Sequence, residues 1–168
     1  MEMVDVIDCE GHVLSVVRKD EAHAQGFLHK CVIGALRNSK SEFMLIRPPT
    51  HKQDAGQYVF PVGGHVSSGE SEVAALEREV EEEIGITGFA SKRIGQDTFD
   101  RHVLGRHENH LFVLYEIISD QEPIAGGELE TMHWFTPDAL RKAISIEREA
   151  FGDAFYFVAE RFYPELLN

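Results

Sequence analysis

Three glutamates near the middle of the chain have the spacing of a metal-binding cluster. The pattern of residues 70–84 predicts a helix that ends at Gly85, a residue type that often terminates helices. Each helical residue advances by about 100°, so Glu79, Glu82 and Glu83, at positions i, i+3 and i+4, share an arc of roughly 100°. Such close like charges repel unless a cation lies among them, and carboxylate oxygens suit Mg²⁺ or Mn²⁺.

The same helix has an apolar face that would attach it to a core. Val73, Leu76, Val80 and Ile84 fall on one stripe, about 80° wide, apart from the three glutamates. A run of glutamates taken alone is most often only the solvated face of a helix. The residues around the run therefore decide between a solvated face and a metal site.

The flanking residues extend the acidic cluster into a longer pattern of fixed spacing. Its members are Gly64, Glu70, Arg78-Glu79-Val80, Glu82-Glu83 and Gly85-Ile86. This resembles the complete Nudix box, G-x5-E-x7-R-E-U-x-E-E-x-G-U with U aliphatic, and departs from it at no fixed position. A chance match has odds on the order of 10⁻⁸ at average residue frequencies. The resemblance implies a Nudix hydrolase, which cleaves a phosphoanhydride bond in a small diphosphate compound with the help of Mg²⁺.

The resemblance also implies roles for the matching residues. Glu79, Glu82 and Glu83 would hold the metal together with the carbonyl of Gly63, and Glu70 would reach it through water. Arg78 would orient the carboxylates. From helical geometry alone, Arg78 is four residues from Glu82 and suitably placed for an ion pair, so an ordinary surface pair is its alternative role.

A hydrolase of this kind needs a carboxylate to accept the proton of the attacking water. Nudix enzymes take this base from the box helix or from a later loop. Glu128 is the loop candidate because it lies ahead of a strand-to-helix transition, and Glu130 is its neighbouring alternative. Both could equally be solvated loop acids.

Residues 4–8, 19–23, 26–29 and 62–66 resemble segments of the Nudix subgroup that contains isopentenyl diphosphate isomerases. That subgroup has a cysteine immediately before a Gly-His pair, where this chain has Gly63. It also has a Glu-x-Glu pair on a central strand, and here the second acid is replaced by His110. Both departures argue against an isomerase, which stays the rival interpretation beside a nucleotide-sensing module without catalysis.

Four residues partly match the metal ligands of the isomerases. They are His23, His29, His65 and Glu108, although the spacing of the first two is one residue shorter here. The resemblance implies a second metal site at these residues. The alternative is that they are ordinary loop and strand-edge side chains, since imidazole is accommodated without a metal.

Several residues outside the box could contact a substrate. Arg47, in the loop before the box, and Arg106, in a His/Arg-rich segment, could bind phosphate groups, or they could be solvated. Tyr58 and Phe60 could stack on a base, although alternating aromatic residues in a strand more often belong to a core.

The expected elements give an α+β fold with a mixed sheet between helical layers, the α/β/α sandwich of the Nudix type. Residues 1–168 read as a single domain in which residues 1–29 form an N-terminal β-hairpin and short helix, and residues 64–86 the Nudix box. Strands are expected at 4–7, 13–17, 31–36, 43–46, 89–99, 110–118 and 132–135, and further helices at 20–25, 136–144 and 153–162.

The charge balance limits the class of partner. Sixteen basic against 29 acidic residues give a net charge of −13, which disfavours nucleic-acid polymers and anionic membranes. A small phosphorylated substrate is compatible with this charge because bound cations can offset the acidic cluster. Cys9 and Cys31 lie in apolar runs and are expected to be buried, reduced thiols. We expect a soluble cytoplasmic protein, and the resemblance is compatible with a homodimer.

Overall fold

The computed structural model describes residues 1–124 and 131–168. The strands in this part of the chain are β1 (Met3–Ile7), β2 (Val13–Arg18), β3 (His29–Arg37), β4 (Phe43–Arg47), β5 (Val62–His65), β6 (Ala90–Val103), β7 (Arg106–Ile118) and β8 (Thr131–Phe135). The helices are α1 (Lys19–Gln25), α2 (Glu72–Ile84), α3 (Pro137–Ile146) and α4 (Asp153–Phe162), with 3-10 turns at Arg148–Ala150 and Pro164–Leu166.

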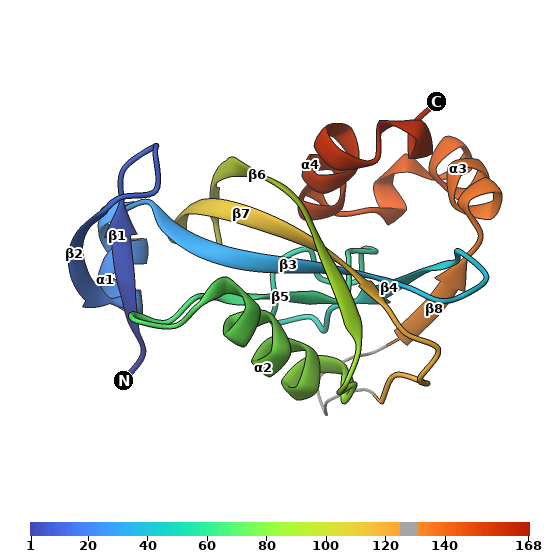
Figure 1. The fold of residues 1–168 in the computed structure, drawn as a ribbon. Coiled ribbons are helices and arrows are strands. Elements are labelled where there is room, and N and C mark those ends of the chain that lie inside the picture. The colour runs from blue at the N-terminus through green and yellow to red at the C-terminus, as the bar shows by residue number, and fades with distance from the viewer. Residues whose placement is uncertain (125–130) are drawn as a thin grey trace.

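All eight strands join one mixed sheet (Figure 1). The long strand β3 runs parallel to β7 and antiparallel to β1, β4 and β5. The hairpin partners β1–β2 and β6–β7 and the pair β4–β8 are also antiparallel. The mixed α+β architecture predicted from the sequence is confirmed.

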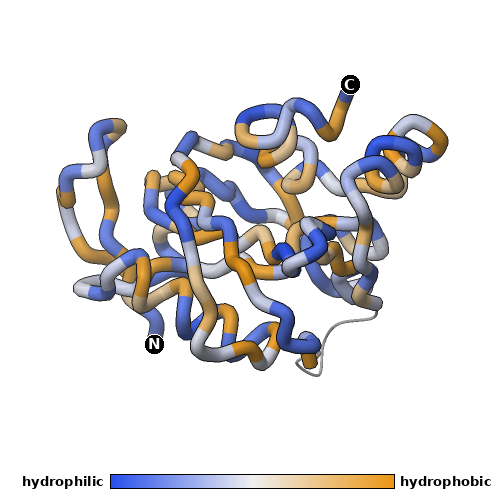
Figure 2. Tube along the Cα trace, turned by 45° about the vertical axis from the view of Figure 1, so that its right-hand side comes forward, coloured by the Kyte–Doolittle hydropathy of each residue, from blue (hydrophilic) through white to orange (hydrophobic). Residues whose placement is uncertain are grey.

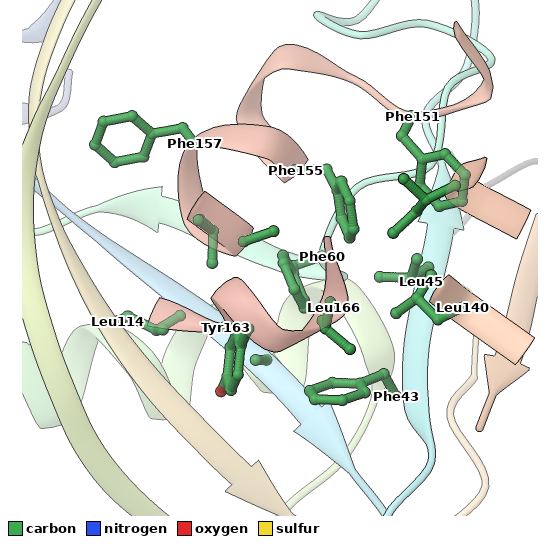
Figure 3. Packing of buried hydrophobic residues seen from close by; sticks show 14 of the residues in the cluster. Phe43, Leu45, Phe60, Leu114, Leu140, Phe151, Phe155, Phe157, Tyr163 and Leu166 are labelled. Atoms are coloured by element: carbon green, nitrogen blue, oxygen red, sulfur yellow. The ribbon is translucent and has the colours of Figure 1, made fainter. Parts of the chain in front are cut away.

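The sheet lies between helices, and its two faces bury separate hydrophobic clusters. Alternate residues of β3 point to opposite faces, so Val32 and Leu36 pack in the cluster that includes residues of α2, while Cys31 and Ala35 pack in the cluster that includes residues of α3 and α4. Figure 1 shows α2 on one side of the sheet and α3 and α4 on the other. Figure 3 shows the aromatic packing beneath α4, where Phe60 stacks on Phe155.

Helix α2 carries the expected acidic cluster but begins two residues later than predicted. The Ser71 hydroxyl accepts a hydrogen bond of 3.1 Å from the Ala74 amide, so Ser71 is the N-cap and Glu70 lies outside the helix. Gly85 ends the helix with a φ of 65°, as predicted. Val73 is not part of the apolar face, because 47% of it is exposed, whereas Leu76 is fully buried. Each large apolar residue buried in this way stabilises the fold by about 1.5–3 kcal/mol.

The His/Arg-rich segment is part of a long hairpin, not a loop between shorter strands. Strands β6 and β7 stay paired up to Val103 and Arg106. The two residues between them, Leu104 and Gly105, both have positive φ, at 50° and 73°, as a tight two-residue hairpin turn requires. The extended pairing places this segment on the β6–β7 hairpin.

The N-terminal hairpin β1–β2 forms one end of the sheet and is followed by α1, as expected (Figure 1). Gly26 ends α1 in the left-handed conformation. Cys31 is buried as predicted, but Cys9 is exposed in the hairpin turn, because the apolar run stops at Ile7. Both cysteines are free thiols.

Hydrophobic and hydrophilic residues are interspersed along the trace (Figure 2). Among the helices in the described part of the chain, none is long and apolar enough to cross a membrane.

Candidate active site

A cleft of about 650 Å³ opens between the loop after β4, the strand β5 and the hairpin β6–β7. Glu82 and Glu83 reach it from α2, and Gly63 and Gly64 of β5 form part of its wall. Apolar side chains, among them Phe60, Phe112 and Val158, also line it. The cleft thus joins an acidic wall to an apolar one.

The box glutamates meet β5 at its glycines. Glu83 accepts a hydrogen bond of 3.2 Å from the Gly63 amide. The Glu79 carboxyl lies against Gly64 so closely that a Cβ there would be 2.0 Å from the Glu79 Cδ. Glu82 is more open, with 60% of its side chain exposed. The glutamates that helical spacing predicted to share one face of α2 therefore lie where α2 contacts β5.

The environment of Glu79 and Glu83 opposes the ionisation of these two carboxylates. Burial, reinforced by the negative charge of Glu79, raises the pKa of Glu83 to about 8. Burial also raises the pKa of Glu79, although its ion pair with Arg78 acts in the opposite direction. A divalent cation among hard oxygen donors would relieve this repulsion, so the donor set fits Mg²⁺ or Mn²⁺.

Arg78 connects the elements of the acidic site. Its guanidinium donates to both carboxylate oxygens of Glu70 at 2.9 Å, to Glu79 at 2.5 Å and to the His65 carbonyl at 3.0 Å. The Glu82 pair expected from the i, i+4 spacing is longer, at 3.7 Å. The bond to Arg78 lowers the pKa of Glu70, and the Ser67 amide also donates to this carboxylate. The structure thus makes Glu70 the partner of Arg78.

Four histidines from four different elements meet beside the cleft. His23 of α1, His29 of β3, His65 of β5 and His110 of β7 each offer a ring nitrogen, and these four atoms lie within 4.8 Å of one another. We call these residues the histidine tetrad. Burial lowers the pKa of all four, that of His23 to about 4 and that of His65 to about 2, which favours the neutral form of the imidazoles.

Glu108, the fourth ligand implied by the isomerase resemblance, does not belong to this group. One of its oxygens accepts from Gln53 at 2.6 Å and from Arg106 at 3.3 Å, and the other accepts from Arg101 at 3.0 Å. The expected second metal set is therefore corrected: His110 occupies the place of Glu108. The strand register causes this, since His110 lies opposite His29 and Glu108 opposite Arg101.

The loop after β4 is fixed by a buried ion pair that the sequence did not reveal. Arg101 donates to both oxygens of Asp54 at 3.1 Å, and Asp54 also accepts from the Asp153 amide at the start of α4. The side chains of Asp54 and Arg101 are only 7% and 15% exposed. No short motif encodes this pair, because its members lie 47 residues apart.

The four predicted substrate contacts separate into two groups. Phe60 and Arg106 line the cleft. Arg47 and Tyr58 do not line it: the Arg47 guanidinium lies 4.3 Å from the centre of the Tyr58 ring, and that ring packs edge-on against Phe135. The alternative core role of Tyr58 is therefore the one that the structure supports. Glu128 and Glu130 lie outside the described residues.

Comparison with known proteins agrees with this geometry. The family model of the NUDIX domain matches residues 27–155, which include the whole box. The chain belongs to the Nudix family. A solved structure from Deinococcus radiodurans is similar to this Nudix protein with a TM-score of 0.75 and 25% identity, over 96% of this chain and 99% of that one. The MutT protein of Methanosarcina mazei has a TM-score of 0.66 and 26% identity, over 84% and 96% of the two chains.

Curated relatives match this Nudix protein over shorter segments. An uncharacterized Nudix hydrolase of Streptomyces coelicolor is 34% identical over 52% of this chain and 49% of its own length. The matched segment thus spans about half of that relative. An isopentenyl-diphosphate Delta-isomerase of Serratia proteamaculans is 27% identical over 82% of this chain and 76% of its own.

Proposed function

We propose that this Nudix protein is a Mg²⁺-dependent hydrolase that cleaves a phosphoanhydride bond in a small diphosphate compound, either nucleoside-linked or of another kind. The observation that carries the proposal is the acidic cluster at the cleft: Glu82 and Glu83 line it, and Glu79 lies against its Gly64 wall. Burial, reinforced by the charge of Glu79, raises the pKa of Glu83 to about 8. Such a cluster destabilises a protein without a cation and suits one that binds a divalent metal.

The chain offers a defined set of oxygen ligands. Glu79, Glu82, Glu83 and the Gly63 carbonyl would hold Mg²⁺, or Mn²⁺ in its place. The bound metal would neutralise phosphate oxygens and lower the pKa of a coordinated water for in-line attack on phosphorus. Arg78 would fix the position of Glu79 through its short ion pair, and Glu70 would in turn fix Arg78.

The proton of the attacking water requires an acceptor. Glu82 lines the cleft and has the more accessible carboxylate, so within the described residues it is the box glutamate best placed to exchange a proton with water. Glu128 stays a prediction for the same role.

Basic side chains of the cleft would orient the phosphates. Arg106, Lys52 and His51 are among the residues that line it, and the Arg106 side chain is 42% exposed. The apolar wall around Phe60 would take the part of the substrate that carries no phosphate. A cleft with both basic and apolar side chains suits a small phosphorylated molecule.

The test is the release of phosphate or pyrophosphate from nucleoside triphosphates, ADP-ribose, nucleotide sugars and isopentenyl diphosphate, with and without Mg²⁺. We expect Mg²⁺-dependent hydrolysis in the wild type and a loss of about 10²-fold or more in Glu82→Gln. The matched control is Glu77→Gln, an exposed residue of α2 outside the cleft, which should keep full activity. Activity that is equal without Mg²⁺, or equal in Glu82→Gln, would contradict the proposal.

The same panel separates the rival functions. The likeness to the Serratia isomerase over 82% of this chain favours testing isopentenyl diphosphate, although Gly63 stands where the resemblance implies the isomerase cysteine. Isomerised product without hydrolysis would identify an isomerase, and binding of a nucleotide without turnover would identify a sensing module. A cytoplasmic location and a homodimer also stay proposals, to be checked by fractionation and by sedimentation.

A further inference from the structure

The histidine tetrad has the shape of a four-coordinate metal site. The six distances between its ring centroids all lie between 4.6 and 5.4 Å. Four points that are nearly equidistant from one another lie at the corners of a tetrahedron. Structural Zn²⁺ sites have this geometry.

The spacing of the ring nitrogens supports the same reading. His23 Nε2 lies 3.2 Å from His110 Nε2 and 3.3 Å from His65 Nε2. Zn–N bonds are about 2.0–2.1 Å long, so a tetrahedral ion holds its ligand nitrogens about 3.3–3.4 Å apart. These two separations are thus already close to those that such an ion requires, and all four nitrogens lie within 4.8 Å of one another.

His29 supplies an independent observation. This residue is fully buried, and its Nδ1 donates to the Phe27 carbonyl at 2.7 Å. Its Nε2 is buried and has no hydrogen-bond partner among the described residues. Histidine ligands of metals typically donate their second ring nitrogen to a backbone carbonyl in this way. The unpartnered nitrogen is costly in the apo protein, and a bound cation would satisfy it.

We propose that the histidine tetrad is a structural Zn²⁺ site that fastens the N-terminal segment to the Nudix core. His23 lies in α1, ahead of the residues that match the family, and the other members lie on strands of the core sheet. The site is closed, because four protein nitrogens fill a tetrahedral ion and three of the four residues are buried.

The donor set separates this site from the acidic one. Neutral imidazoles suit Zn²⁺ and other late transition metals, whereas the carboxylates of α2 suit Mg²⁺. Glu108 adds no oxygen ligand, since both its oxygens are engaged by other side chains. The two sets of metal ligands share no residue, although His65 and His110 also line the cleft. Zinc content and thermal stability therefore test the zinc proposal without a measurement of hydrolysis.

The test is zinc content and thermal stability of the full chain. The protein is stripped with a chelator, reloaded with Zn²⁺, dialysed and analysed by elemental mass spectrometry. We expect about one zinc per chain, a higher Tm on loading, and at least about tenfold weaker zinc binding in His23→Ala. Glu82→Gln and Glu108→Gln should keep the zinc, as should His102→Ala, which removes an exposed histidine outside the tetrad.

Two results would overturn the proposal. One is a wild type that keeps no stoichiometric zinc after reloading. The other is loss of zinc in Glu108→Gln with retention in His110→Ala, which would indicate the mixed site that the isomerase resemblance implies. Because a tetrad variant could fail to fold, Co²⁺ is also added to the stripped wild type. The intense visible absorption of tetrahedral Co²⁺ is expected, and the weak spectrum of an octahedral ion would count against the site.

Discussion

The carboxyl group of Glu79 occupies the space in which a side chain of Gly64 would begin. A Cβ on Gly64 would lie 2.0 Å from the Glu79 Cδ and 2.1 Å from its Oε1. The first glycine of the box is therefore required by a direct contact with a glutamate fifteen residues later. Close approach, not backbone conformation, is the cause, because Gly64 has no positive φ.

Gly64→Ala should therefore displace Glu79 and disturb metal binding. We expect hydrolysis to fall at least about tenfold and the Mg²⁺ concentration for half-maximal activity to rise. A double-mutant cycle with Glu79→Gln is the control, since both changes act through one carboxylate. Losses that simply add in the double variant would show that Gly64 acts by another route.

The metal-free protein should lose stability as the pH rises because of Glu83. The folded-state pKa of about 8 exceeds the ordinary value of 4.5, so the folded chain holds a proton that the unfolded chain releases. The destabilisation is absent below about pH 4.5, grows as the pH rises and is complete above about pH 8. Glu83→Gln should remove it, raising the Tm of chelator-treated protein at pH 8.5 while abolishing hydrolysis.

The exposed Glu77 provides the matching control for this experiment. Glu77→Gln should leave the pH dependence of the Tm unchanged. A Tm for Glu83→Gln that is no higher than that of the wild type at pH 8.5 would refute the assignment. Added Mg²⁺ should narrow the difference in Tm between Glu83→Gln and the wild type, because the cation stabilises the wild-type carboxylate cluster.

Arg78 should not be replaceable by lysine. Its planar guanidinium binds Glu70 through two parallel hydrogen bonds and also reaches Glu79 and the His65 carbonyl. Arg78→Lys keeps the charge but loses most of these bonds, so we expect about 1–3 kcal/mol less free energy of unfolding and at least about tenfold lower activity. Chemical denaturation measures the free energy of unfolding, and an activity assay during Mg²⁺ titration measures hydrolysis. Wild-type values in Arg78→Lys would show that the positive charge alone is sufficient at this position.

Arg101→Ala should be among the more damaging changes away from the box. It would leave the buried carboxylates of Asp54 and Glu108 without this partner, at a cost of about 3–5 kcal/mol in free energy of unfolding. The control is Arg161→Ala, which breaks a more exposed pair with Asp97 and should cost about 1 kcal/mol or less. Equal losses in the two variants, measured by urea unfolding, would show that burial does not decide the effect.

The local features of this protein follow from its sequence alone. The spacing of Glu79, Glu82 and Glu83 places them on one face of a helix by geometry, and Gly85 marks where that helix ends. Thr136 followed by Pro137 likewise predicts the start of α3, where the Thr136 hydroxyl accepts from the Ala139 amide. These are relations between residues within a few turns of one another, where covalent geometry limits the choices.

Tertiary structure alone decided which distant side chains meet. The parallel pairing of β3 with β7 sets His110 opposite His29, and a shift of two residues along β7 would have set Glu108 there instead. Tertiary packing likewise places Arg101 against Asp54 and leaves Arg47 and Tyr58 outside the cleft lining. Strand register depends on the packing of both faces of the sheet at once, and no short stretch of sequence contains that information.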